Sequence, residues 1–217
     1  MTLHNLDIYI AAVVLLSILT IVIHWSGTRK PPLSNLLFRI FLIANTYHII
    51  VAALIKNEGI LSTPHLFRTG AIGLFIATPL VYLILIKSFK NEPWKKIDNL
   101  HFIPTILYVV DFLPFFSLPS ELKLVAIGDL GKIGFTTTFG YGECWLIGGS
   151  FWMVSKVLHP LTYSILSLIT LYRITVQSGL SFRKDNRNLI ILLYLLSAYL
   201  IFYYYSHRTK LRKSNGF

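Results

Sequence analysis

Residues 70–116 constrain the fold most strongly, because they read as two apolar segments joined by a basic turn. Residues 71–89 are almost wholly apolar, and residues 100–116 are apolar again apart from a few polar positions. The turn between them, residues 87–99, holds four lysines against one glutamate and one aspartate. A helix that crosses a bilayer needs about 20 mostly apolar residues, and short loops rich in Lys and Arg stay on the cytoplasmic side. The unit is therefore predicted to cross to the cytoplasm, turn and return.

The composition of the whole chain favours the same environment. Apolar residues make up 54% of the 217 residues and charged residues only 13%, about half the usual share in soluble domains. The formal charge of +11 would suit nucleic acid, but in a membrane protein it is more typical of basic loop ends beside anionic headgroups. The single cysteine, Cys144, excludes an intrachain disulfide and a cysteine-based metal cluster.

The predicted fold class is all-α: one transmembrane domain over residues 1–217, built as a polytopic membrane helix bundle. Six spans are expected, at about residues 7–25, 35–55, 70–89, 100–116, 157–176 and 188–205. Gly70 and Gly73 should let the third span approach a neighbouring helix closely, and Pro79 should kink it.

A long connection, residues 117–156, separates the fourth and fifth predicted spans. It is rich in glycine and carries balanced charges, and it contains no long apolar stretch. Long connections of this kind are uncommon unless they are functional. We expect an outer loop with a short interfacial helix at residues 121–131, and an aromatic segment lying at the membrane surface.

The distribution of basic residues predicts the topology. The turns after spans one, three and five are richer in Lys and Arg than the two outer loops, which places the N-terminus outside in a multi-pass protein of the cytoplasmic (inner) membrane. Six spans would then leave the basic tail, residues 207–217, outside, against the same rule. Either a seventh span is missing, or the sixth does not fully cross, or the tail is tolerated outside; we take the chain to be cut short.

A few polar and aromatic residues in or beside the spans are candidates for binding a ligand. Asp111 is the most costly of them to bury; it is either a helix-end acid at the interface or one wall of an outward-open polar pocket. His48, three positions from Asn45, could bond to a neighbouring helix or line a polar pocket. The candidate set, drawn from the outer loop and the outer ends of the spans, is Asp111, Glu143, Trp145, His159, Tyr163 and His48.

Four short segments between residues 33 and 172 carry a resemblance to a known family. They are Pro64 to Leu66, residues 78–89 with the run TPLVYL and then KSF, residues 94–115 with HFIP and LPF, and residues 143–163 with ECWLIGG. In their order and spacing they resemble the membrane-embedded, seven-helix sensor half of bacterial transcription regulators that end in a helix-turn-helix domain of the arabinose-regulator (AraC) type. The last helix of that half and the DNA-binding domain are absent from this sequence.

The resemblance implies an integral membrane sensor in transcription regulation, which detects an extracytoplasmic ligand or partner and relays a helix shift to the cytoplasmic side. The expected partners are the lipid bilayer and an unidentified ligand; homo-oligomerisation stays open, and direct binding of nucleic acid by this chain is not expected. The alternative is a transporter or channel subunit whose path is lined by Asn45, His48, Asp111 and His159. A membrane enzyme would need Asp111, Glu143 and His159 to converge; no catalytic residues, metal site or cofactor are predicted.

Overall fold

The computed structural model describes residues 33–56, 58–90, 92–131 and 144–177, together with the isolated helical positions Leu15, Ile18 and Val22. The predicted spans 7–25 (apart from those three positions) and 188–205, the basic tail and Glu143 lie outside the described residues. Every regular element in the described part is helical. The elements are α2 (Leu33–Lys56), η1 (Gly59–Leu61), η2 (Pro64–Leu66), α3 (Gly70–Lys90), η3 (Lys96–Phe102), α4 (Ile103–Asp111), α5 (Leu113–Phe116), α6 (Ser120–Gly131) and α7 (Gly149–Gln177).

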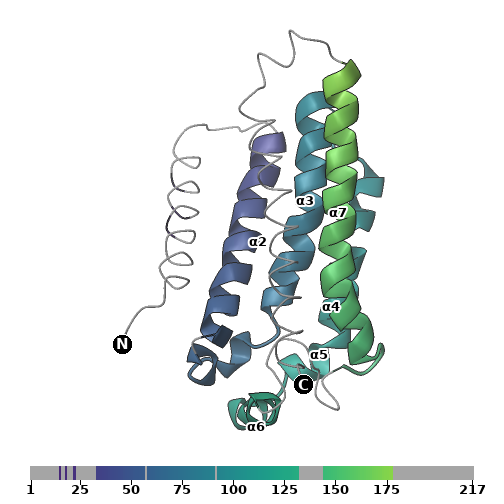
Figure 1. The fold of residues 1–217 in the computed structure, drawn as a ribbon. Helices are drawn as coiled ribbons and strands as arrows, with labels where there is room; N and C mark the ends of the chain where they lie inside the picture. The colour runs from purple at the N-terminus through teal and green to yellow at the C-terminus, as the bar shows by residue number, and fades with distance from the viewer. Residues whose placement is uncertain are drawn as a thin grey trace, which may run out of the picture.

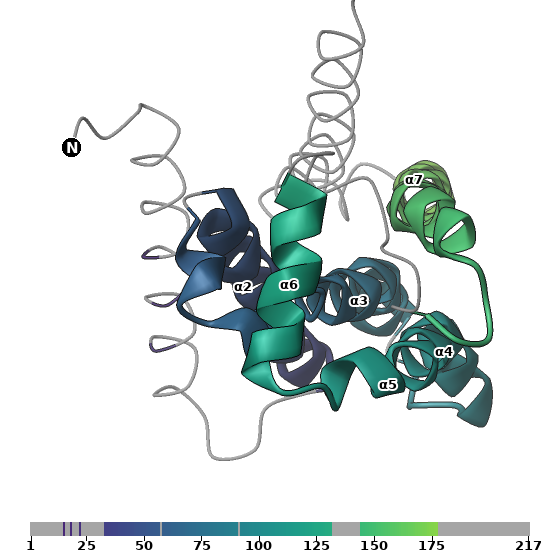
Figure 2. The ribbon, with the colours of Figure 1, turned by 90° about the horizontal axis from the view of Figure 1, so that it is seen from below.

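The long helices α2, α3 and α7 lie side by side, and η3, α4 and α5 follow one another along the same bundle (Figure 1). The chain runs along α2, back along α3, along the η3–α5 segment and back along α7. The end of α2, the beginning of α3, α5 and the beginning of α7 therefore share one end of the bundle, which we name the Asp111 end. The opposite end, where α3 passes into η3, is named the Lys87 end. Helix α6 lies across the Asp111 end (Figure 2).

Three of the described helical segments are long and apolar enough to cross a membrane: Leu33–Ile55, Pro64–Phe89 and Gly149–Ile174. The segment that contains α3 is central. Within its 18-residue apolar stretch 72% of the residues are buried, compared with 33% and 22% in the other two segments. The outer faces of α2 and α7 expose large apolar side chains such as Ile43, Leu158 and Ile169. Exposed apolar surface on this scale is typical of contact with lipid or with further chain.

The predicted fourth span, residues 100–116, is helical but not one continuous helix. It is divided into the end of η3, the nine-residue α4 and the four-residue α5, and it is not among the three segments named above. Pro104 and Pro114 each lie in the first turn of an α-helix, where a missing N–H is tolerated. The prolines therefore begin new helices rather than kink one. The outer side of this segment still exposes Ile103, Ile106 and Leu113.

Helices α2 and α3 pack closely where two glycines face α2, as the sequence predicts. A Cβ atom on Gly73 would lie 2.5 Å from the carbonyl oxygen of Ala44, and one on Gly70 would lie 3.0 Å from the side chain of Val51. The ring nitrogen Nδ1 of His48 lies 2.9 Å from the carbonyl oxygen of Gly70. His48 therefore bonds across to the neighbouring helix.

The predicted outer loop, residues 117–156, contains more helix than expected. Helix α6 occupies Ser120–Gly131, in agreement with the short helix predicted at 121–131. Helix α7 begins at Gly149, eight residues before the predicted start of the fifth span at residue 157, and continues through Pro160 to Gln177. The additional turns carry Trp152 and Lys156 into the bundle, and Trp152 is almost completely buried.

Candidate functional site

The carboxylate of Asp111 binds the segment that leads into α7. Its Oδ1 atom accepts hydrogen bonds from three successive backbone N–H groups, those of Trp145, Leu146 and Ile147, at 3.0, 2.5 and 3.1 Å. Its Oδ2 atom accepts a hydrogen bond from the indole N–H of Trp152 in the first turn of α7. Asp111 is fully buried. These four donors therefore take the place of the water molecules that burial removes from the carboxylate.

A layer of aromatic rings lies directly inside the Asp111 end, with one ring from each of three helical segments. Phe75 of α3, Tyr108 of α4 and Trp152 of α7 have ring centroids 5.4, 5.9 and 5.0 Å apart. The tilted and edge-to-face geometries are those that aromatic pairs prefer. The Tyr108 hydroxyl donates to the carbonyl oxygen of Arg68 at 2.9 Å, which fixes α4 against the beginning of α3.

The next layer is polar and joins α3 to α7. The Thr78 hydroxyl donates to the carbonyl oxygen of Leu74 at 3.1 Å and lies 2.8 Å from Nδ1 of His159. The His159 ring also contacts Phe75 at 5.0 Å and Tyr163 at 4.8 Å between centroids. His159 is therefore held by a hydrogen bond on one side and by rings on two others.

A second aromatic layer lies one helical turn nearer the Lys87 end. Nδ1 of His101 in η3 lies 2.8 Å from the hydroxyl oxygen of Tyr163 in α7. Tyr82 of α3 packs against both rings, with centroid distances of 5.6 Å to His101 and 6.2 Å to Tyr163. All three helical segments thus meet again at this layer.

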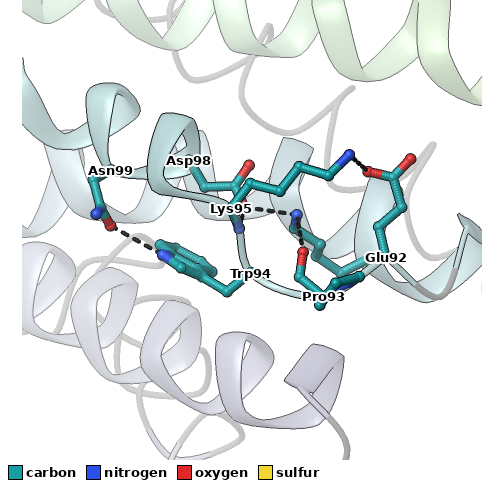
Figure 3. Close-up of polar contacts among 7 residues, drawn as sticks. Glu92, Pro93, Trp94, Lys95, Asp98 and Asn99 are labelled. Atoms are coloured by element: carbon teal, nitrogen blue, oxygen red, sulfur yellow. Dashed lines mark hydrogen bonds and ion pairs between the residues drawn. The ribbon is translucent and has the colours of Figure 1, made fainter.

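The layers described above form one stack that begins at Asp111. An ion pair between Lys87 and Asp98 closes the other end of this stack. Their Nζ and Oδ2 atoms are 2.6 Å apart, and both side chains are buried. Lys87 also donates to the carbonyl oxygen of Pro93 at 2.9 Å, and Asp98 accepts the backbone N–H of Lys95 at 2.7 Å. Figure 3 shows these contacts together with the bond from Trp94 to Asn99. The turn after α3 is therefore held by side chains as well as by its backbone.

The charge on Asp98 is favoured by these partners. Burial alone would raise the pKa of the Asp98 carboxyl, but the hydrogen bonds from Lys87 and from the Lys95 backbone outweigh that effect and hold the pKa below its ordinary value. The exposed Lys95 ammonium group donates a hydrogen bond to the Glu92 carboxylate, which raises the pKa of Lys95.

Helix α6 is attached to the Asp111 end through a buried lysine. The Nζ atom of Lys123 lies 2.9 Å from Nδ1 of His65 and 2.8 Å from the carbonyl oxygen of Phe116. The other ring nitrogen of His65 lies 2.8 Å from the Ser120 hydroxyl. Burial lowers the pKa of Lys123, yet its ammonium group keeps two acceptors, so this cluster positions α6 across the bundle.

The structure brings four of the six predicted site residues into one continuous stack. Asp111 and Trp145 meet at its end, and His159 and Tyr163 lie further along α7. His48 lies apart from the stack, at the crossing of α2 and α3, and Glu143 lies outside the described residues. The Trp145 ring is mostly exposed, although its indole N–H donates to the carbonyl oxygen of Val110 at 2.9 Å.

Several residues of the stack were not among the predicted site residues: Thr78, His101, Trp152 and the Lys87–Asp98 pair. His101 and Trp152 carried a usable signal, since each is a hydrogen-bonding ring in an apolar or glycine-rich context. Thr78 carried little, because a lone threonine in an apolar helix is usual. Within the ranges that the structure describes, no three His, Cys, Asp or Glu residues are grouped in a way that could hold a metal ion.

No protein-family model matches this chain, and neither searches of curated proteins nor searches of solved structures returned a match.

Proposed function

We propose that this chain is an integral membrane sensor or signalling domain, which detects an extracytoplasmic ligand or partner and relays a helix shift to the cytoplasmic side. One observation carries the proposal: α7 joins both ends of the bundle. Its first turn and the segment before it are bound by Asp111, and further along it bonds to α3 through His159 and to η3 through Tyr163. A displacement at the Asp111 end has a direct mechanical route to the Lys87 end.

The exposed side chains at the Asp111 end support a recognition role. Trp145 and Leu146 are 62% and 55% exposed, although their backbone N–H groups are fixed by the Asp111 carboxylate. Exposed aromatic and apolar side chains on a fixed backbone are typical of binding surfaces. A ligand or partner bound there would act on the segment that leads directly into α7.

The finer features of this proposal come from the sequence. We propose six or seven spans in the inner (cytoplasmic) membrane, with the N-terminus and the Asp111 end outside, because the basic turns then face the cytoplasm. The resemblance to the sensor half of AraC-type regulators supports the same orientation and a role in transcription regulation. The proposed partners are the lipid bilayer and the external ligand, with self-association open; neither catalysis nor direct binding of nucleic acid is proposed.

Transport is the weaker alternative on this geometry. A transport path needs polar groups that can exchange partners with the solute, whereas the Asp111 carboxylate accepts four hydrogen bonds from the protein itself. Of the other groups predicted to line such a path, His48 bonds to the backbone of α3 and His159 to Thr78.

A distance measurement across the Lys87 end tests the relay. Spin labels on cysteines at Lys96 and Arg173, both exposed, would report the position of α7 relative to η3 in a Cys144→Ser background in nanodiscs. The substitutions Asp111→Asn and Trp152→Phe remove or weaken contacts at the far end and should shift or broaden the distance distribution. Glu121→Gln changes an exposed acid on α6 at the same end and should not.

The distance distribution distinguishes a working relay from its absence. If the distribution is the same in wild type, Asp111→Asn and Trp152→Phe, the two ends are not coupled through α7 and the relay is wrong. Circular dichroism of each variant shows whether helix content is retained, and Trp152→Phe, which keeps an aromatic ring in the core, serves as the milder change if Asp111→Asn fails to fold.

A further inference from the structure

A serine, a histidine and a lysine form a hydrogen-bonded chain where α6 crosses the Asp111 end (Figure 2). Nε2 of His65 in η2 lies 2.8 Å from the Ser120 hydroxyl oxygen, and Nδ1 of the same ring lies 2.9 Å from Nζ of Lys123. Ser120 and Lys123 both belong to the first turn of α6. The three side chains therefore join the beginning of α6 to the segment before α3, and we name them the α6 latch.

The charge on Lys123 determines which nitrogen of His65 carries the hydrogen. An ammonium group has three donors and no acceptor, so Nδ1 of His65 must accept. The ordinary pKa of a lysine is about 10.4, so Lys123 stays charged from pH 5 to 8 even though burial lowers its pKa. The hydrogen of the neutral ring then lies on Nε2 and is donated to the Ser120 hydroxyl. The latch is thus complete only while His65 is neutral.

A proton on Nδ1 would break the latch. It would occupy the lone pair that Lys123 uses, and it would place an imidazolium 2.9 Å from an ammonium group. The His65 ring is exposed to solvent, so a proton can reach it, whereas Lys123 is only 1% exposed. A buried cation that loses its acceptor and faces a like charge is unfavourable. Histidine changes its charge between about pH 5 and 8, so mild acid is sufficient.

The other charged groups around the latch do not offset this repulsion. Arg68, after η2, and Lys156 of α7 are positive, and each lies over an aromatic ring. Glu58, beside η1, and Glu121 of α6 are exposed, and the Asp111 carboxylate is engaged by its own four donors. Within the ranges that the structure describes, no acidic side chain bonds to the histidine or the lysine of the latch.

We propose that the α6 latch is an acid-sensitive switch: α6 lies across the Asp111 end while His65 is neutral and leaves it when His65 gains a proton. Apolar packing opposes the release only in part, since Ile127 of α6 is fully buried but Leu122 and Val125 are mostly exposed. Because the latch lies at the proposed outer end, it would make the sensor respond to external pH. This last step rests on the proposed function, whereas the release of α6 does not.

A distance measurement across the latch tests the switch. Spin labels on cysteines at Leu61 of η1 and Val125 of α6, both exposed, report the position of α6 in the Cys144→Ser protein in nanodiscs. We expect one narrow distance population at pH 8 and a longer, broader distribution at pH 5, and the change should reverse when the pH is raised. Glu121→Gln removes an exposed acid beside the latch and should leave this response unchanged.

Two substitutions within the latch identify its cause. His65→Asn places an amide oxygen, which accepts but does not titrate, close to the position of Nδ1. It should keep the pH 8 distribution at pH 5. Lys123→Gln removes the positive charge, and its amide can donate to a neutral ring or accept from a protonated one. The response to acid should therefore fall by at least about half, which decides the matter if His65→Asn does not hold α6 at either pH.

Equal distributions at pH 8 and pH 5 in the wild-type latch would overturn the switch. An undiminished response to acid in either latch variant would overturn it as well, because the change would then arise from another group. The relay is tested separately, by the distances between Lys96 and Arg173 at constant pH. A failure of the switch is therefore distinguishable from a failure of the proposed sensor function.

Discussion

Tyr163 and His101 are 62 positions apart in the sequence, yet the Tyr163 hydroxyl oxygen and His101 Nδ1 lie 2.8 Å apart between α7 and η3. Tyr82 of α3 packs on both rings, so one contact brings together the three segments that form the core of the bundle. The contact is part-buried, so water would replace a lost partner only in part.

Removing the Tyr163 hydroxyl should therefore weaken the core without leaving a large cavity. We expect Tyr163→Phe to lower the free energy of unfolding by about 1 kcal/mol, because one hydrogen bond is lost while the ring is retained. Unfolding by SDS in mixed micelles measures the change. Tyr172→Phe is the matched control on the same helix, since Tyr172 is 65% exposed; equal effects in the two variants would contradict the role given to this contact.

The sequence was sufficient to locate α2 and α3, whose long apolar runs contain few charged residues. Helix α2 occupies Leu33–Lys56 and α3 Gly70–Lys90, close to the predicted 35–55 and 70–89, because both runs end at charged residues. The division of residues 100–116 into separate helices was harder to predict, since the same prolines are compatible with a kinked helix and with two helix starts. The additional first turns of α7 carry Trp152, which is buried against Phe75 and Tyr108. This contact between helices is not visible in the local sequence.

The candidate site was predictable only in part, for a related reason. Asp111, Trp145, His159 and Tyr163 stand out in the sequence as polar or aromatic groups in apolar surroundings. Their partners are set by the register of one helix against another, which a single sequence does not fix. Asp111 lies 34 residues before Trp145, and Thr78 lies 81 residues before His159, so neither pairing follows from local spacing.

The Asp111 carboxylate should contribute more to stability than any other single group in the stack. Hydrogen bonds to a charged group are worth about 1.5–3 kcal/mol each, and Asp111→Asn replaces one acceptor oxygen with a donor that faces N–H groups. We expect a loss of at least about 3 kcal/mol and faster proteolysis near Trp145. Glu121→Gln should change stability by less than about 0.5 kcal/mol, as exposed substitutions usually do; a similar small effect of Asp111→Asn would show that its four donors find other partners.

The close crossing of α2 and α3 makes a strong prediction for Gly73. A Cβ atom there would lie 2.5 Å from the Ala44 carbonyl oxygen, which belongs to the backbone of α2 and cannot turn aside. We expect Gly73→Ala to cost about 1–3 kcal/mol from overpacking, measured by SDS unfolding. At Gly148 the nearest atom to an added Cβ is the Ser150 hydroxyl oxygen at 3.8 Å, so Gly148→Ala should be tolerated. If both alanine variants unfold alike, the two helices are not in close contact at Gly73.

The buried ion pair at the Lys87 end should respond differently to single and double substitution. Lys87→Met leaves Asp98 as a buried charge without its main partner, and Asp98→Leu does the same to Lys87. Breaking such a pair typically costs about 3–5 kcal/mol, whereas replacing both members by apolar residues is often neutral. The double variant should therefore recover most of the stability that either single variant loses. Additive losses in a double-mutant cycle would show that the pair has no net coupling.

The same pair predicts a pH dependence with a definite sign. The pKa of Asp98 lies below its ordinary value in the folded protein, because the bonds from Lys87 and the Lys95 backbone outweigh the opposing effect of burial. A group whose pKa is lowered on folding stabilises the protein above its unfolded pKa, about 4 for aspartate, and loses that contribution as the pH falls through the folded pKa. The stability difference between wild type and Asp98→Asn should accordingly be constant from pH 8 to about pH 5 and shrink below about pH 4. Glu92→Gln supplies the control, since Glu92 pairs with Lys95, an exposed lysine. A difference that grew on acidification would mean that the carboxyl of Asp98 is protonated in the folded bundle, and the ion pair would have to be discarded.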